Sequence, residues 1–208
     1  MQNKAKSTLV KDAVILFLIT LIAGLGLGFC NEVTKGPIED SNLKAKQEAY
    51  QSVYKDAKTF DEDEAVAEKV KDSEQFLSDQ DLTGASISEV LIAKDDSGNA
   101  IGYVISFVAK EGYGGDIELS MGMTNEGEIT GLKVLSADET AGLGAKCKDA
   151  EFQDQFAGKN VDSIEYTKDG ATKDNQIDAI SGATITTKAV TKGVNAAIAF
   201  LKQDIMQG

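Results

Sequence analysis

The sequence predicts an α+β protein in which one N-terminal transmembrane helix precedes a domain with a mainly antiparallel sheet packed by helices. Three observations lead to this prediction. Residues 13–30 are apolar and uncharged. From residue 85 onwards, runs of β-branched and aromatic residues alternate with short turn sequences, which is typical of strands joined by hairpins. Near the end of the chain, apolar residues recur at helical spacing.

The apolar segment at residues 13–30 reads AVILFLITLIAGLGLGFC, with Thr20 as its polar side chain. As a helix it would measure roughly 27 Å, close to the thickness of a bilayer core. A cleaved signal peptide is disfavoured because the segment is long for one and no small-residue cleavage site follows it. Lysines precede the segment and acidic residues follow it, so the positive-inside rule predicts that residues 1–12 are cytoplasmic and residues 31–208 extracytoplasmic.

Residues 31–84 are predicted to be a helical and acidic connecting region. After Pro37, apolar residues at one-face spacing predict a helix over residues 41–58, with Ser41 as its N-cap. Residues 59–82 are acidic and irregular, which favours a solvated helix with loops.

The domain at residues 85–208 begins with segments typical of strands: SISEVLIAK, AIGYVISFVAK, DIELSMGM and ITGLKVLS. Short turn sequences separate them, which favours an antiparallel sheet over repeated βαβ units. Residues 187–203 place their apolar side chains on one stripe, which predicts an amphipathic helix packed on the sheet.

The composition excludes several classes of function. The chain has 34 acidic residues, 21 cations that are all lysines, and a net charge of −13. Nucleic acid is therefore excluded as a partner, because phosphate backbones require a basic face. Histidine and arginine are absent, which removes Ser-His-Asp catalysis, histidine metal sites and arginine phosphate forks.

The two cysteines, Cys30 and Cys147, are far apart in sequence and form neither a CxxC redox pair nor a haem-attachment motif. A disulfide between them is disfavoured because Cys30 lies at the edge of the membrane segment, so we expect two free thiols. Nothing in the chain can hold an iron–sulfur cluster, which needs several thiolates in one place.

Three stretches combine glycine with hydroxyl or carboxylate side chains: GYGGDI at 112–117, DETAGLGAK at 138–146 and DAISGAT at 178–184. Small residues let the backbone approach a planar or phosphorylated ligand closely, although each stretch alone is also compatible with a tight turn. GLG does not begin a dinucleotide fingerprint, because Cys147 stands where the third glycine is needed. At the last stretch, Ser181, Thr184 or Thr187 can cap the final helix, or the helix start can hold an anion, and composition leaves both open. Thr186 and Thr187 are expected to cap or pack.

DAISGAT matches the pattern D-x-x-[ST]-G-A-T of the FMN-binding domain, in which a flavin transferase joins FMN through its phosphate to the last threonine, here Thr184. The wider chain resembles the G-subunit family of Rnf electron transport complexes, because NEVTKGPI, GYVISFVAKEGYGGDI, DETAGLGAK and DAISGAT follow a membrane span in that order. Ala141 departs from the family, which commonly has proline there, and this change should loosen the turn.

The resemblance implies a covalent FMN and a set of residues around it, with no catalytic residue or metal ligand on this chain. Glu139, Thr140 and Leu143 would lie against the flavin ring. Lys168 would contact the flavin or its phosphate, and Asp178 would serve transferase recognition or fix the turn. Plain surface charge remains the alternative for Glu139 and Lys168. The remaining implied binding residues are Gly142, Gly144, Ser181, Gly182 and Ala183.

The implied function is that of an anchored electron carrier in an Rnf complex, which couples ferredoxin oxidation and NAD reduction to ion transport. Its partners would be the other proteins of the complex and, during maturation, the flavin transferase. FMN would supply the redox chemistry, while the protein supplies position and electrostatics. Two alternatives remain: the C subunit of the sodium-pumping NADH:quinone oxidoreductase, which shares the flavin domain, and a stand-alone anchored flavin-binding sensor.

Overall fold

The computed structural model describes residues 2–207 of the chain. Within them, side chains are described at residues 11, 13–29, 32–34, 44 and 46–207. The chain forms two compact units, Met1–Ala45 and Lys46–Gly208. The first unit is helical and contains Ala13–Thr34, which has a mean hydropathy of 2.6 and is long and apolar enough to cross a membrane.

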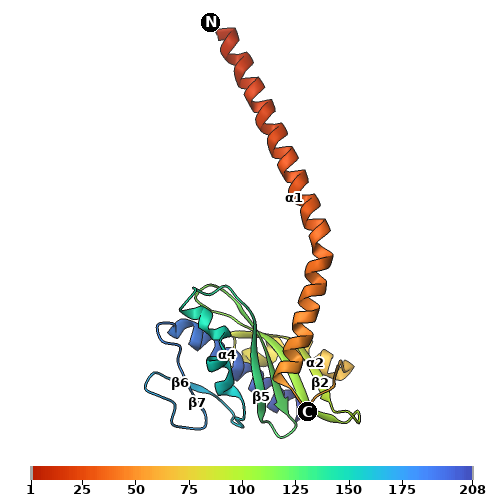
Figure 1. Ribbon diagram of the computed structural model, residues 1–208, viewed down its shortest axis with the longest axis vertical. Coiled ribbons are helices and arrows are strands. Elements are labelled where there is room, and N and C mark those ends of the chain that lie inside the picture. The colour runs from red at the N-terminus through yellow and green to blue at the C-terminus, as the bar shows by residue number, and fades with distance from the viewer. Residues whose placement is uncertain (1, 208) are drawn as a thin grey trace. The chain divides into compact units, whose positions relative to one another are not determined.

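Helix α1 runs from Gln2 to Val53 without interruption (Figure 1). Residues 41–53 are helical as predicted, but they do not form a separate helix and the predicted end is wrong, because α1 passes through Pro37 and ends at Val53. Proline lacks one amide donor, but the hydrogen bonds on either side of it can continue the helix. Ser41 is therefore an interior residue of the helix, and its side chain lies outside the described ones.

The second unit is built on one antiparallel sheet with the strand order β1-β2-β3-β4-β5. Its four long strands lie where the sequence predicts them, and their neighbours pair antiparallel. The short edge strand β1 lies in the acidic region, where no strand was predicted. The strands are β1 (Thr59–Asp61), β2 (Ala85–Lys94), β3 (Ala100–Ala109), β4 (Ile117–Thr124) and β5 (Ile129–Ala137).

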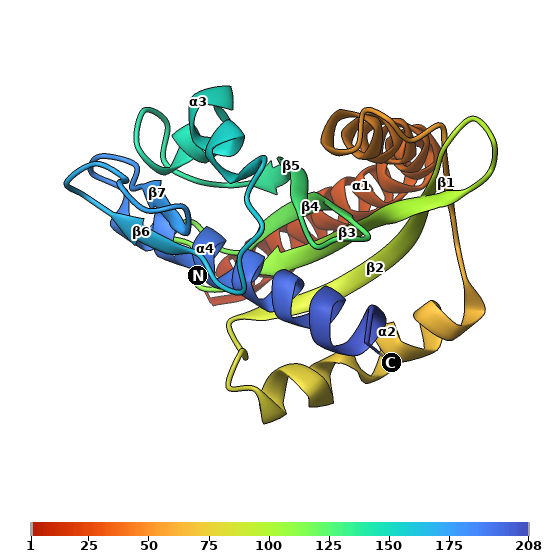
Figure 2. The same ribbon diagram turned by 90° about the horizontal axis from the view of Figure 1, so that it is seen from below.

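Helices α2 (Glu64–Asp79) and α4 (Thr184–Ala199) cover one face of the sheet (Figure 2). The predicted α+β class is confirmed, as is the solvated helix in the acidic region. The apolar stripe of the last helix is buried as predicted, but α4 begins at Thr184 and continues as a π-helix, η3 (Phe200–Ile205). The buried stripe consists of Val190, Val194, Ala197, Ile198 and Leu201.

The last turns of α1 pack on the opposite face of the sheet. Tyr50 and Val53 join a second apolar cluster with side chains of β2 and β3. Gly122 permits this close approach, because a Cβ there would lie 2.6 Å from the carbonyl oxygen of Val53. The Tyr50 hydroxyl donates to Glu89 Oε2 at 2.5 Å. Burial, followed by the contact with Glu89, raises the pKa of Tyr50.

An irregular excursion connects β5 to α4, and the sequence did not predict its elements. It contains a two-stranded parallel sheet, in which β6 pairs with β7. Gln153 covers the edge of β5, because its side-chain oxygen accepts from the amide of Val134 at 3.1 Å. The elements are η1 (Gly144–Lys148), α3 (Ala150–Gln153), η2 (Asp154–Phe156), β6 (Glu165–Thr167) and β7 (Gln176–Asp178).

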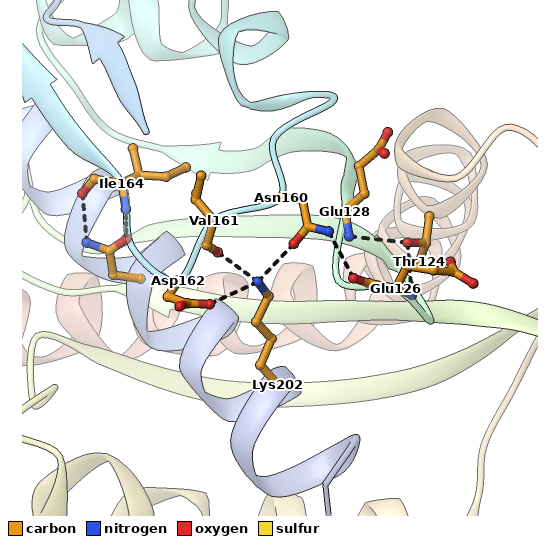
Figure 3. Close-up of polar contacts among 9 residues, drawn as sticks. Thr124, Glu126, Glu128, Asn160, Val161, Asp162, Ile164 and Lys202 are labelled. Carbon is orange, nitrogen blue, oxygen red and sulfur yellow. Dashed lines mark hydrogen bonds and ion pairs between the residues drawn. The ribbon is translucent and has the colours of Figure 1, made fainter. Parts of the chain in front are cut away.

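Lys202, in η3, fastens the part of this excursion that leads into β6 (Figure 3). Its ammonium group donates to Asn160 Oδ1 at 3.1 Å, to the Val161 carbonyl at 3.0 Å and to Asp162 Oδ1 at 3.2 Å. Asn160 donates in turn to the carbonyl of Glu126, in the turn between β4 and β5, at 3.0 Å. The clamp therefore joins three segments that are distant in sequence.

Candidate functional site

The carboxylate of Glu139, just after β5, links the first two glycine-containing stretches to the first turn of α4. Its Oε2 accepts a hydrogen bond from Thr186 Oγ1 at 2.9 Å, in the first turn of α4. Its Oε1 accepts from the amide of Gly114 at 3.3 Å, in the loop between β3 and β4. One side chain thus gathers segments that are far apart in the sequence.

Glycine is required where these segments meet. A Cβ on Gly144 would lie 2.2 Å from Glu139 Oε2 and 2.6 Å from Thr186 Oγ1. A Cβ on Gly112 would lie 2.8 Å from Glu139 Oε1, and one on Gly114 would lie 2.0 Å from the carbonyl oxygen of Asp138. The first two stretches and the first turn of α4 therefore pack more closely than any larger residue at these glycine positions would allow.

Four hydroxyl side chains surround the start of α4, and two of them are already engaged. Thr186 is 1% exposed and donates to Glu139. Thr187 is 0% exposed; its hydroxyl donates to the Ala183 carbonyl and accepts from the amide of Ile180. Thr187 thus ties the preceding loop to the helix.

The other two hydroxyls remain available. Thr184 is partly exposed and Ser181 is exposed, and within the described part of the chain neither hydroxyl has a hydrogen-bond partner. Thr184 is the first residue of α4, whose N-cap is Ala183, a residue without a capping side chain. The sequence left open whether Ser181, Thr184 or Thr187 caps the helix, and the N-cap position falls to none of them.

The first turn of α4 also presents free amide groups. The amides at residues 184–186 have no acceptor among the described residues, whereas that of Thr187 donates to the Ala183 carbonyl at 3.0 Å. Such amides and the positive end of the helix dipole favour an anion.

The loop before α4 lies against the turn that follows β5. Gly182 has a φ of +77°, and a Cβ on it would lie 3.1 Å from Leu143 Cδ2. Gly142 has a φ of +76°, which also favours glycine. The carbonyl of Thr140 accepts from the amides of Leu143 and Ala145, each at 3.1 Å, and closes this turn.

The segments that meet at the site also carry large exposed apolar side chains. Within residues 46–207, the large hydrophobic residues that are exposed are Tyr113 (69%), Leu143 (45%) and Ile185 (53%). Each comes from a different segment of the site. We name these three residues the apolar rim.

Lys168 and Asp178 lie at the ends of the small parallel sheet. Thr167 pairs with Asp178, and the Thr167 carbonyl accepts from the amide of Ala179 at 2.7 Å. Lys168 is the first residue of the loop after β6, and this loop therefore starts beside the stretch that leads to Thr184. The side chain of Lys168 is exposed. Asp178 Oδ1 accepts from the amide of Ala171 at 2.6 Å, so this carboxylate fixes the intervening loop.

Cys147 lies beneath the site and is a free, fully buried thiol. Burial, and then the negative charge of Glu139, raise the pKa of this thiol to about 11. The side chain of Cys30 lies outside the described residues, so the expectation of a free thiol there stays a prediction.

Sequence reasoning missed Thr186 and the glycines of the first stretch as parts of the site. It identified GYGGDI as a ligand-compatible loop but named no residue in it. Thr186 was expected to cap or pack and is buried as expected, but its hydrogen bond to Glu139 was not predicted. Spacing alone cannot predict that partner, because the contact joins residues 47 positions apart.

Comparison with known proteins adds to this geometry. Residues 112–199 match the FMN-binding domain family. The chain is 38% identical over 191 residues to the G subunit of the Na(+)-translocating ferredoxin:NAD(+) oxidoreductase complex of Acetobacterium woodii, over 90% of this chain and 89% of that protein. It is 42% identical over 106 residues to the G subunit of the proton-translocating ferredoxin:NAD(+) oxidoreductase complex of Clostridium ljungdahlii, over 51% of this chain and 56% of that one. A solved structure of the C subunit of Na(+)-translocating NADH-quinone reductase from Parabacteroides distasonis is 27% identical, with a TM-score of 0.47 over 54% of this chain and 60% of that one.

Proposed function

Because the chain belongs to the G-subunit family of ion-translocating ferredoxin:NAD(+) oxidoreductase complexes, also named Rnf, we propose that it is the anchored flavoprotein electron carrier of such a complex. FMN is joined through its phosphate to Thr184. The chain serves as one component of an ion-translocating oxidoreductase and has no substrate site of its own.

One observation supports Thr184 as the attachment site. Among the threonines at the start of α4, Thr184 is the one whose hydroxyl has no hydrogen-bond partner among the described residues. Thr186 and Thr187 are buried and hydrogen-bonded within the protein. Thr184 is partly exposed, and its hydroxyl has no partner among the described residues. The flavin transferase must reach the hydroxyl to which it attaches the FMN phosphoryl group. Thr184 meets this requirement because it is partly exposed.

The surroundings of Thr184 fit a phosphodiester linked to a planar ring. The free amides of the first turn of α4 favour a negative group, which the phosphodiester would supply. The apolar rim offers surface to an aromatic ring, and Leu143 belongs to it. FMN, when bound, supplies one- and two-electron transfer. Ser181, Gly182 and Ala183 bring backbone and a hydroxyl near the phosphate.

We assign the other predicted residues supporting roles. Lys168 is an exposed cation beside the loop that leads to Thr184 and serves as a counter-charge for the phosphate. Asp178 holds the loop through the amide of Ala171 and contributes to recognition by the flavin transferase. Glu139 positions the site through Thr186 and Gly114, and together with Thr140 and Leu143 it lies against the flavin ring.

The partners are the other proteins of the complex and the flavin transferase that matures this chain. The near full-length match to the G subunit of Acetobacterium woodii favours this function over that of the C subunit of a sodium-pumping NADH:quinone oxidoreductase. Copurification with membrane proteins of the complex would distinguish this function from that of a stand-alone flavin-binding sensor, which would purify alone.

The apolar stretch of α1 serves as the membrane anchor in this proposal. Ala13–Thr34 is long enough to span a bilayer, and the lysines before it orient the N-terminus towards the cytoplasm. The FMN domain is then extracytoplasmic. Labelling of single cysteines introduced at exposed positions such as Asp96 tests this orientation. If an impermeant reagent fails to label Asp96→Cys in intact cells, the FMN domain is cytoplasmic and the proposed orientation is wrong.

The attachment itself is tested by producing the chain with its flavin transferase and measuring the intact mass after denaturation. Wild type should gain one FMN phosphoryl group, and Thr184→Ala should gain none. Thr184→Ser keeps a hydroxyl and should be modified. A Thr184→Ala chain that still carries flavin would contradict the proposed site.

A further inference from the structure

The loop between β3 and β4 holds an exposed aromatic side chain beside the site, to which the proposed function gives no role beyond its membership of the apolar rim. Tyr113 is 69% exposed, although it is one of the chain's 5 tyrosines and the others are buried or partly buried. Large aromatic side chains usually bury most of their surface. An exposed tyrosine in the one part of the domain that also exposes Leu143 and Ile185 therefore suggests a ligand-contacting surface.

The loop that carries Tyr113 is held at both ends. Before it, the carboxylate of Glu111 accepts from Lys192 Nζ, on α4, at 2.7 Å. After it, the amide of Gly114 donates to Glu139 Oε1 at 3.3 Å. Glu111 has a φ of +71°, in the left-handed region that non-glycine residues rarely adopt.

The glycines on both sides of Tyr113 make the loop dense. A Cβ on Gly112 would lie 2.2 Å from the Gly115 carbonyl oxygen, and a Cβ on Gly114 would overlap the Asp138 carbonyl. The loop therefore packs directly on the backbone beside Glu139. A strained, closely packed loop holds the backbone of Tyr113 in place while its side chain remains exposed.

We propose that Tyr113 forms a contact wall for the isoalloxazine ring of FMN. This inference rests on the proposed function, because the tether at Thr184 brings the ring to this part of the surface. Glu139 joins the Tyr113 loop to Thr186, two residues after the tether. The phenol ring of Tyr113 offers an aromatic face to the flavin, and such pairs favour offset stacking or edge-to-face contact.

The test uses flavin fluorescence, because a phenol in contact with an isoalloxazine ring quenches its emission. The flavinylated full-length chain is compared with Tyr113→Phe, Tyr113→Leu and Tyr113→Trp. We expect a quenched wild type, a severalfold longer flavin lifetime in the Phe and Leu variants, and a short lifetime again with Trp. Tyr103→Phe is the matched control, because Tyr103 lies near the other end of β3 and packs against the core; its lifetime should equal that of wild type.

Intact mass is measured on every variant. The mass reports whether FMN is attached, and the lifetime reports whether Tyr113 contacts the flavin ring. A Tyr113→Leu chain that carries FMN and keeps the wild-type lifetime overturns the inference. If Tyr113→Leu keeps the wild-type flavin lifetime but no longer transfers electrons to the purified partner proteins, the inference is also overturned. Tyr113 would then be assigned to a contact with a partner protein.

If the wild-type chain proves unmodified, the proposed attachment fails and the wall is tested with free FMN. Tyr113→Leu should then weaken FMN binding by about two- to tenfold, the equivalent of one lost aromatic pair. Equal affinity of the two chains, or no binding by either, would count against the wall.

Discussion

Thr186 Oγ1 donates to Glu139 Oε2 at 2.9 Å, and this bond joins the first turn of α4 to the turn after β5. Thr186 is almost fully buried, so losing its charged acceptor leaves a buried hydroxyl without a partner. We expect a double-mutant cycle of Glu139→Ala and Thr186→Val to give a coupling energy of about 1–3 kcal/mol in the free energy of unfolding. Urea denaturation measures it, and additive single effects would contradict the bond's role.

The same cycle tests the requirement for glycine. Gly144→Ala places a methyl group 2.2 Å from Glu139 Oε2, so it should remove the Glu139–Thr186 coupling. Gly142→Ala is the matched control: its position has a positive φ but open space around it, so it should cost about 1–2 kcal/mol of backbone strain and preserve the coupling. Persistence of the coupling in Gly144→Ala would show that the backbone moves to make room.

The Lys202 clamp should contribute more to stability than an exposed ion pair does. Lys202→Met removes three hydrogen bonds from a side chain that is 17% exposed. We expect it to lower the free energy of unfolding by about 1–3 kcal/mol. Lys192→Met is the control; its pair with Glu111 is 41% and 63% exposed, so it should cost less than about 1 kcal/mol. Equal losses would show that the clamp contributes no more than an exposed ion pair.

Cys147 should resist alkylation, because burial raises its pKa to about 11 and the thiolate is the reactive form. In a Cys30→Ser chain at pH 8, iodoacetamide should modify Cys147 only after denaturation. The raised pKa also means that the thiol favours the folded state fully at neutral pH, and that this contribution is lost as the pH rises through about 11. Rapid labelling of the folded chain at pH 8 would contradict the burial.

Local patterns predicted much of the fold. Four strands of β-branched residues between turn sequences, and the buried stripe of α4, follow from periods that neighbouring residues set. The continuity of α1 through Pro37 did not follow, because proline is a common but not an obligatory helix boundary. The parallel pairing of β6 with β7 also escaped prediction, since strands of three residues are too short to show an alternating pattern.

The site was predicted in outline only. The three glycine-containing stretches were visible, and their hydroxyl and carboxylate residues indicated a ligand. The contacts of Glu139 with Gly114 and Thr186 depend on the sheet, which brings the ends of β3 and β5 and the start of α4 together. Resemblance to a flavin domain selected Thr184, and the hydrogen bonds of Thr186 and Thr187 provide an independent physical reason for that choice.

The most direct measurement of the central claim is tandem mass spectrometry of the tryptic peptide 174–188 from the chain matured by its flavin transferase. This peptide, DNQIDAISGATITTK, contains all four hydroxyls near the start of α4, so fragmentation discriminates among them. We predict one FMN phosphoryl group, located on Thr184. An unmodified peptide, or a group on Ser181, Thr186 or Thr187, would contradict it.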